Sequence, residues 1–224
     1  MKTMRKIAAL TAALCLASSL LCGCRSEKQL TEDFEVPKQG CENAIALESG
    51  EIMIYASVKA EKDVPVYATN SSTETYIKFV QGEALEYDLT ANTTITSTGE
   101  TSTFEATQEM GELVQLQDGV VISAEEPDIF EGFRINYTTA DIESIEVVST
   151  GDGLTLYAVT MTGAYADTFD LEADGVKSDC TKVLYNYYVD ASGVTRTVLS
   201  EFTRTVTSDG ESQSVTEFTQ TKIN

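Results

Sequence analysis

The sequence contains neither histidine nor tryptophan, and it has only 3 prolines in 224 residues. Without histidine the chain cannot build a Ser-His-Asp triad, a Cys-His pair or a zinc site based on imidazole. No glycine-rich loop follows a strand pattern and opens a helix, so the sequence indicates no nucleotide site. Two carboxylates could still act as a glycosidase pair, but acidic residues are so frequent that neighbouring pairs arise by chance. We therefore expect a protein that is not an enzyme and needs no cofactor or metal.

Cationic residues are also scarce: 15 Lys and Arg stand against 36 Asp and Glu, a formal net charge of −21. A charge of this sign repels phosphate backbones and anionic head groups. It argues against nucleic acid as a partner and against a protein that lies flat on a membrane. Val, Ile, Leu, Phe and Tyr nevertheless recur in strand-like runs along the chain. We therefore expect a folded domain, monomeric in solution, and not a disordered acidic chain.

The first 23 residues have the composition of a secretory signal. Three cations, at Lys2, Arg5 and Lys6, precede an apolar stretch over residues 7–21, which is shorter than the roughly 20 residues that span a bilayer. The stretch runs into Leu21-Cys22-Gly23-Cys24, which resembles the lipobox of bacterial lipoproteins. The resemblance implies cleavage before Cys24 and lipid on its thiol, so that two acyl chains anchor an extracytoplasmic protein to a membrane. The alternative is an ordinary signal peptide that happens to contain cysteines.

Removal of residues 1–23 would leave 12 cations against the same 36 acids, a net charge of −24. Apart from Cys24, the remaining cysteines would be Cys41 and Cys180. An even pair in an exported protein predicts a disulfide between them. Two free thiols are the alternative.

The exported part divides into two segments. Residues 24–49 mix charges with Pro37 and Gly40 and show little periodicity, so we expect a lipidated tether. Residues 50–224 are predicted to form one β-rich domain, because a chain of this length supports one well-filled core and is small for two.

Alternation of period two predicts antiparallel strands in this domain. Leu85, Tyr87 and Leu89, for example, alternate with acidic residues, and the Asp118-Gly119 step between two apolar runs is typical of a hairpin. We predict a mainly β fold: a single strongly curved antiparallel sheet, a half-barrel in meander order, with about nine to eleven strands and at most one or two short helices. Residues 163–179 are the expected place for a short helix or excursion, and residues 183–223 for three consecutive neighbouring strands.

One acidic segment has the spacing of a calcium loop. Asp170, Glu172 and Asp174 precede Gly175 as in the first half of an EF-hand loop. The position that should carry a bidentate Glu is Thr181, and no flanking helices are indicated. The pattern therefore favours a solvated acidic turn over a metal site.

The C-terminal part carries a family resemblance. Tyr185-x-Tyr187-x-Val189-Asp190, a glycine turn, a long Thr/Val strand, an Asp209-Gly210 turn and a last strand ending Ile223-Asn224 resemble the final sheet of LolA-like lipoprotein domains. Residues 141–145, followed by Tyr157, are similar to the strand pair that lies just upstream of this final sheet in LolA-like domains. The resemblance implies an incomplete β-barrel that wraps helices and whose concave apolar face holds acyl chains in carrier members. The first half of this sequence departs from that pattern, since it shows no obvious helix.

Two function classes remain open. In the first, the curved sheet binds a lipid or another apolar ligand. In the second, the same sheet is filled by its own side chains, and the protein has a structural or interaction role toward protein or cell-wall partners. The difference depends on whether apolar side chains fill the concave face. The residues expected on that face are Leu85, Tyr87, Leu89, Leu154, Leu156, Tyr185 and Tyr187.

Overall fold

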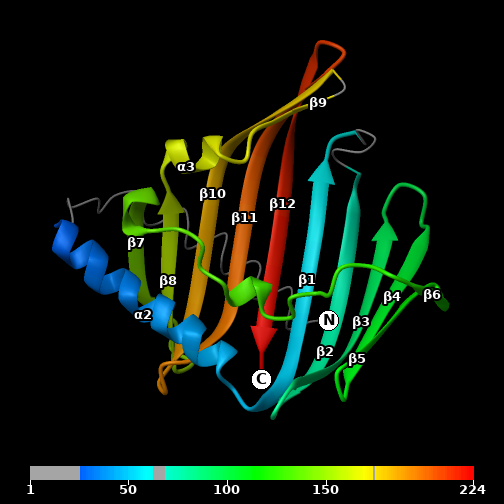
Figure 1. Ribbon diagram of the computed structural model, residues 1–224. Helices are drawn as coiled ribbons and strands as arrows, with labels where there is room; N and C mark the ends of the chain where they lie inside the picture. The colour runs from blue at the N-terminus through cyan, green and yellow to red at the C-terminus, as the bar shows by residue number, and fades with distance from the viewer. Residues whose placement is uncertain (1–25, 63–68, 174) are drawn as a thin grey trace.

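A single large antiparallel sheet dominates the computed structural model, which describes residues 26–62, 69–173 and 175–224. The expected signal segment and Cys24 lie outside these residues. The sheet has 12 strands in the order β6-β5-β4-β3-β2-β1-β12-β11-β10-β8-β7, with β9 paired to β10 off this path. It is strongly curved, and its two ends do not meet (Figure 1). The predicted fold class is confirmed.

Most strands follow one another with short connections, and the longest connection is residues 123–141 between β6 and β7. Their bounds are β1 (Ser49–Ala60), β2 (Ser71–Gln81), β3 (Leu85–Ile95), β4 (Thr101–Glu109), β5 (Glu112–Gln117), β6 (Val120–Ile122), β7 (Ile142–Ser149), β8 (Leu154–Met161), β9 (Leu171–Ala173), β10 (Val176–Asp190), β11 (Thr195–Ser208) and β12 (Glu211–Ile223). β10, β11 and β12 are consecutive neighbours, as predicted for residues 183–223. The last strand then pairs with β1, which joins the two meanders into one sheet.

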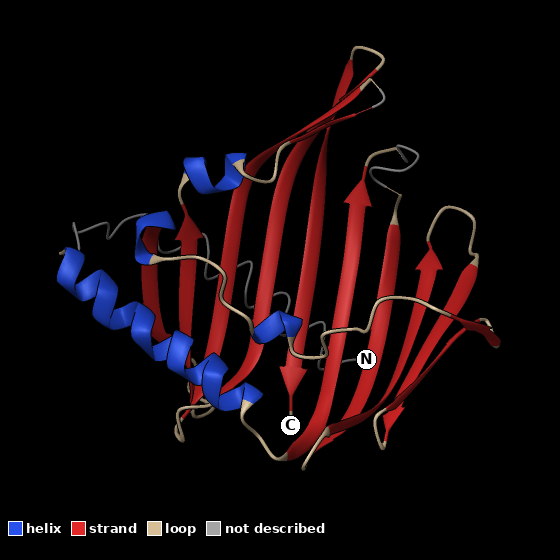
Figure 2. Cartoon of the chain, viewed as in Figure 1, coloured by secondary structure: helices blue, strands red, loops and turns tan. Residues whose placement is uncertain are grey.

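Helical segments gather on one face of the sheet (Figure 2). They are α2 (Glu27–Ile45), the short 3-10 helices η2 (Glu131–Phe133) and η3 (Thr139–Asp141), and α3 (Gly163–Asp167). We call this face concave and the opposite face convex. α2, the connection 123–141 and α3 together form what we call the covering layer. α3 and β9 both lie in the segment predicted to hold a helix or excursion.

Helix α2 lies where the sequence predicted a tether, and the expectation that helices would be short is wrong there. It has 19 residues, and the side chain of Ser26 caps its N-terminus by accepting from the backbone N–H of Gln29. Its buried residues include Phe34, Pro37 and Cys41. Its end is tied down as well, because the side chain of Gln81 on β2 donates to the carbonyl of Ile45 at 2.6 Å.

Two glycines let the covering layer approach the sheet closely. A Cβ at Gly40 of α2 would lie 2.5 Å from Thr195 Oγ1 on β11, and a Cβ at Gly132 of η2 would collide with Thr221 on β12. Real Cβ atoms do not approach other atoms so closely, so both contacts require glycine. The helix and the connection are therefore seated on β11 and β12 by backbone contact.

Candidate functional site

The concave face holds five of the seven residues predicted to meet a ligand. Tyr87, Leu89 and Tyr187 belong to the main buried cluster, and Leu85 and Tyr185 pack against it.

Leu154 and Leu156 are on the other face. Val159 and Met161 of the same strand belong to the core, so alternation along β8 turns the even-numbered positions to the convex face. The prediction for these two leucines was wrong, because β8 carries apolar side chains on both faces and the sequence alone does not fix which set faces inward.

Tyr185 and Tyr187 do not line a cavity, because aromatic rings of the covering layer fill the space above them. Tyr137 stacks on Tyr185 with ring centroids 5.1 Å apart, and its hydroxyl shares a hydrogen bond of 2.7 Å with that of Tyr187. Phe34 of α2 stacks on Tyr137 at 5.5 Å. Tyr165 of α3 approaches Tyr185 with hydroxyls 3.4 Å apart. This part of the concave face is filled by the protein itself.

Burial also sets the protonation of these tyrosines. Loss of hydration raises the pKa of Tyr137, Tyr185 and Tyr187 above the ordinary value of 10.0. Their phenols are therefore neutral at physiological pH, and none is prepared to act as a base. The cluster is a packing unit held by hydroxyl pairs.

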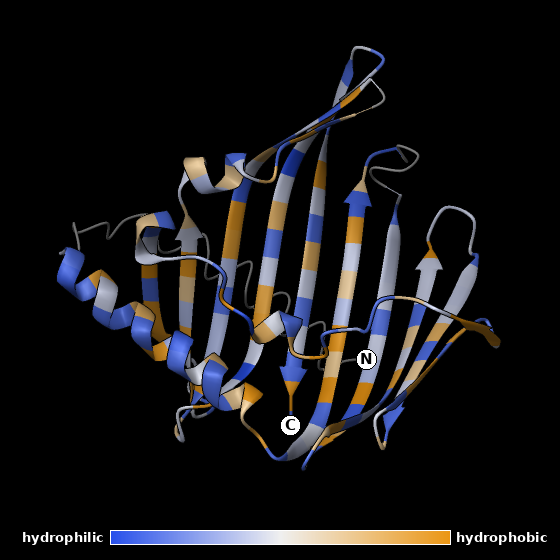
Figure 3. Cartoon of the chain, in the orientation of Figure 1, coloured by the Kyte–Doolittle hydropathy of each residue, from blue (hydrophilic) through white to orange (hydrophobic). Residues whose placement is uncertain are grey.

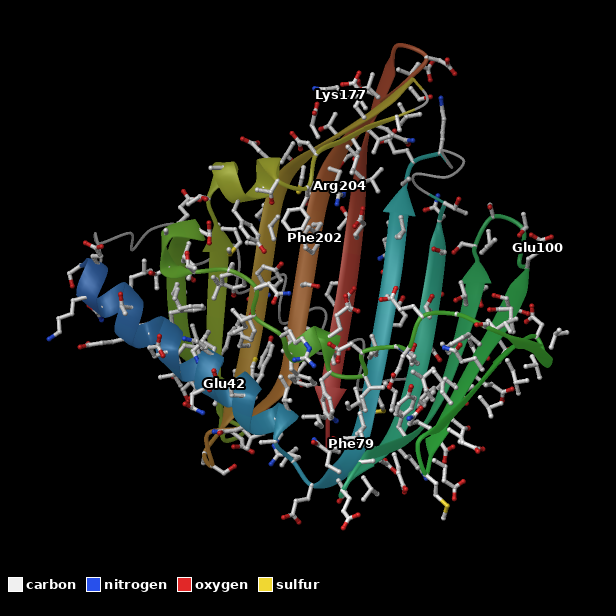
Figure 4. The ribbon with its side chains drawn as sticks, viewed as in Figure 1. Glu42, Phe79, Glu100, Lys177, Phe202 and Arg204 are labelled. Carbon is white, nitrogen blue, oxygen red and sulfur yellow. The ribbon has the colours of Figure 1, made fainter. Side chains whose placement is uncertain are left out.

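The upper end of the cluster contains one charged contact. Figure 4 places Phe202 and Arg204 on β11, to the right of α3. The ring of Phe202 packs edge-on against Phe169 with centroids 5.1 Å apart. The guanidinium of Arg204 donates to the carbonyl of Phe169 at 2.7 Å and lies 2.7 Å from a carboxylate oxygen of Glu217. Arg204 thus fixes the chain that follows α3 to the sheet.

Cys41 and Cys180 are both buried free thiols, so the predicted disulfide is wrong. The thiol of Cys41 is hydrogen-bonded to the side chain of Thr195 on β11, whereas Cys180 on β10 pairs with Arg204 on β11. Thr195 and Arg204 are nine residues apart on β11, on the order of 30 Å at about 3.3 Å per residue. Burial raises the pKa of the Cys41 thiol from 9.0 to about 12, which makes it unreactive.

The covering layer leaves part of the concave face without a second layer. No described helix or loop crosses the upper part of β1 to β4 (Figure 1). We call this area the open face. Its residues are connected by the strand registers, and all are partly exposed. They are Ile54, Ala56, Val58, Thr73, Thr75, Ala91, Thr93, Ser102, Phe104 and Thr219.

Small side chains dominate the open face. One row across the sheet consists of Thr219, Ala56, Thr73, Thr93 and Ser102 in register. The hydroxyls of Thr73 and Thr93 lie 2.9 Å apart and bond to each other. Such a row cannot fill the space above it, in contrast to the aromatic rows beside it. None of these residues was predicted to meet a ligand. The alternation of Ile54, Ala56 and Val58 with other residue types could have indicated that these three share one face of a strand.

Charge is separated between the two faces of this part of the sheet. Every concave position of β1 to β4 is uncharged, whereas the carboxylates of Glu86, Asp88, Glu105 and Glu109 lie on the convex face. The alternation of hydrophilic and hydrophobic positions along the strands is visible in Figure 3. A neutral, partly apolar surface thus lies behind a strongly acidic one.

Two buried polar atoms of β3 and β4 lack hydrogen-bond partners, and the buried pair Leu89 and Ala106 separates them from the open face. They are the hydroxyl of Tyr87 and the side-chain oxygen of Gln108, which lie on directly paired positions of β3 and β4. A donor and an acceptor left in this way are commonly satisfied by water or by a ligand group.

A shallow pocket lies apart from the open face, between α2 and residues 133–136. It has a volume of about 210 Å³, and its lining includes Cys41, Ile45, Phe133 and Ile135 with Lys38 and Arg134 at the sides. This volume is below the roughly 300–1,000 Å³ of typical ligand pockets. None of the predicted ligand residues lines it.

The part of the chain that the structure describes has neither a candidate metal cluster nor a membrane-spanning helix. It has no group of three or more His, Cys, Asp or Glu side chains that could hold a metal ion. In the calcium-like segment, Asp170 instead accepts the backbone N–H of Cys180 at 2.7 Å, and Asp174 lies outside the described residues. None of the described helices is both long and apolar enough to cross a bilayer.

Comparisons with known proteins give likenesses to solved structures. Neither a family model nor a curated protein matches this sequence. Among solved structures, the chain is similar to the crystal structure of a DUF1329 family protein from Desulfovibrio piger. The two are 10% identical, the match covers 87% of this chain and 91% of that one, and the TM-score is 0.29. At this TM-score the likeness carries no argument about function.

Proposed function

We propose that this protein is an exported, lipid-anchored binding protein that holds an elongated apolar ligand, such as an acyl chain, against the open face. The observation that carries the proposal is that no described residue forms a second layer there: the open face is neutral, partly apolar and lined by small side chains. A filled interaction domain would place large side chains there, as the covered region does around Tyr137. The LolA-like resemblance of the C-terminal strands agrees with the same ligand class.

The dimensions of the open face suit an extended ligand. It crosses five strands, from β12 to β4, and neighbouring strands are about 4.8 Å apart, so it is roughly 20 Å wide. An apolar chain laid across it would cover Ala56 and Ala91 and contact the ring of Phe104.

A direct test is mass spectrometry of an organic extract from protein expressed without its first 24 residues. We expect a lipid that co-purifies in proportion to the protein. A clean extract, together with no binding of a fluorescent fatty acid, would reject the proposed ligand class and leave the interaction role.

A matched pair of variants locates the site. Ala91→Glu places a carboxylate on the open face, whereas Asn92→Glu places the same charge one residue along β3 on the convex face. Because burial of an unpaired charge is costly, Ala91→Glu should weaken fatty-acid binding by about tenfold or more, or roughly 1.4 kcal/mol. Asn92→Glu should bind like the wild type. Equal binding by both variants would exclude the open face.

The anchor is tested separately. Cys24→Ala should abolish labelling by radioactive fatty acid and release the protein into the soluble fraction or block its processing, because only this thiol is placed to form the thioether. Equal labelling of variant and wild type would refute the lipobox assignment without affecting the ligand-binding proposal.

A further inference from the structure

The sheet ends at β6, a strand whose outer side pairs with no other strand of the described residues. β5 and β6 are joined by Asp118 and Gly119, which both have positive φ, 51° and 79°. This is the two-residue turn of a tight hairpin. In such a hairpin Gln117 and Val120 bond to each other, so the N–H and C=O of Val121 point away from β5.

The side chains of this edge are apolar and exposed. The exposed fraction is 65% for Val120, 73% for Val121 and 50% for Val114 of β5. Val120 faces the concave side, and the other two face the convex side. Proteins usually protect an edge strand by keeping it short, or with charge, proline, a bulge or a covering element. β6 is short, at 3 residues, and itself has none of the other four.

The opposite edge of the same sheet is protected. β7 has a bulge between Ile142 and Ser144, carries Glu143 and Glu146, and contacts α2. Both edges belong to the same sheet. If this protein simply tolerated unprotected edge strands, β7 would not need its protection, so the exposed edge of β6 calls for another explanation.

The charge around β6 is of one sign. No Lys or Arg occurs between Lys78 and Arg134, a stretch that includes β3 to β6. The same stretch carries 12 acids: Glu83, Glu86, Asp88, Glu100, Glu105, Glu109, Glu112, Asp118, Glu125, Glu126, Asp128 and Glu131. A second copy of this edge would be repelled, whereas a cationic segment would be attracted and steered toward it.

We infer that the free edge of β6 is a docking site for an extended, lysine- or arginine-bearing segment of a partner protein, which adds a strand to the sheet. Backbone bonds to Val121 would give the register, and the exposed valines would pack against alternate apolar side chains of the segment. Its cations would face the acids of β4 and β5. The inference does not depend on ligand binding at the open face.

The probe is a blocked peptide of alternating Val and Lys, titrated into the full-length chain and followed by fluorescence anisotropy. Two control peptides are needed. One has Glu in place of Lys, and the other keeps every Lys but is N-methylated at alternate residues, so that its charge is unchanged and its strand pairing is blocked. We expect the first peptide to bind and both controls to bind at least about tenfold more weakly.

A matched pair of variants tests the position. Val121→Pro removes the outward N–H at an edge position where proline is tolerated, and Val121→Thr keeps it. The proline variant should lose about tenfold in affinity and the threonine variant less than about twofold, with unchanged circular dichroism in both.

Several outcomes would overturn the inference. They are no binding to the wild type, equal binding of the N-methylated peptide, or equal binding by Val121→Pro. A wild-type dimer that Val121→Pro converts to monomer would show instead that a second copy occupies the edge.

Discussion

The covered region and the open face belong to the same sheet, yet their apolar surfaces are treated in different ways. In the covered region, Phe34, Phe133 and Tyr137 come from outside the sheet and bury its large side chains. On the open face no second layer is present among the described residues, and the strands carry Thr, Ser and Ala. Strand pairing and cross-strand contacts must hold this part together.

This difference indicates where stability and function are separated. Burial of large apolar side chains stabilises the covered region, so substitutions there should act on folding. The open face contributes little buried area, and its residue choice is therefore free to serve binding.

Truncation of one phenylalanine in each region should give the widest contrast. Phe133 of η2 is only 1% exposed, whereas Phe104 of the open face is partly exposed. Phe133→Ala should lower the free energy of unfolding by about 3–5 kcal/mol, and Phe104→Ala by less than about 1.5 kcal/mol, because less surface leaves water. Urea unfolding measures both. Equal losses would mean that the open face is buried in the native protein.

Alkaline pH should act on the covered region alone. The pKa of Cys41 is raised from 9.0 to about 12, and those of the buried tyrosines rise as well. The folded state therefore keeps protons that the unfolded state loses, so the free energy of unfolding is constant below about pH 9 and falls as pH approaches 12. A shift of three pKa units limits the share of Cys41 to about 4 kcal/mol.

Urea midpoints between pH 8 and pH 11 measure this loss, with Cys41→Ala as the comparison. The variant should show a shallower decline than the wild type. Identical slopes would show that the thiol is hydrated in solution and that the covered region is looser than its packing indicates.

The sheet was predictable from the sequence, and the covering layer was not. Period-two alternation and glycine turns act locally, so strands β10 to β12 and their order follow from residues close in sequence. Helix α2 has its own signal, since Leu30, Phe34, Pro37 and Cys41 follow helical spacing. It was missed because a proline and a glycine near the middle usually end a helix, and here Gly40 serves a contact with Thr195 that lies far away in sequence.

The site was harder to predict for a related reason. Size and aromatic character selected Tyr185 and Tyr187 as ligand residues, although such side chains are the ones that a core recruits. The predicted disulfide between Cys41 and Cys180 was wrong for a comparable reason, because an even number of cysteines says nothing about how far apart they lie in the fold. Which concave residues stay uncovered depends on where α2 and residues 123–141 lie, and no local pattern in β1 to β4 contains that information.

The glycine contact should have a smaller but clear effect. Gly40→Ala forces a methyl group to within 2.5 Å of Thr195 Oγ1 and should cost about 1–3 kcal/mol by overpacking. Gly82→Ala is the control, because its nearest neighbour is the carbonyl oxygen of Ala84 at 3.9 Å; it should change stability by less than about 0.5 kcal/mol.

Adding Thr195→Ala to Gly40→Ala should recover part of the loss, since the clashing oxygen is then gone. A double-mutant cycle by urea unfolding measures this coupling. Additive losses would show that α2 does not rest on β11 through this glycine.

The two hydroxyl pairs provide the finest comparison. Tyr137 and Tyr187 share a buried bond of 2.7 Å, and Thr73 and Thr93 share a bond of 2.9 Å on the open face. Tyr137→Phe leaves a buried hydroxyl without its partner and should cost about 1–3 kcal/mol. Thr93→Val leaves Thr73 within reach of water and should cost less than about 1 kcal/mol.

Thr93→Val also adds apolar area where the ligand is proposed to lie. Fatty-acid affinity should therefore rise about two- to fourfold, from at most about 0.8 kcal/mol for one buried methyl-sized group. Urea unfolding and a fatty-acid titration on both variants measure the two quantities independently. A Thr93→Val protein that is as unstable as Tyr137→Phe would show that the open face is covered in solution. One that is stable but binds no more tightly would place the ligand elsewhere on the molecule.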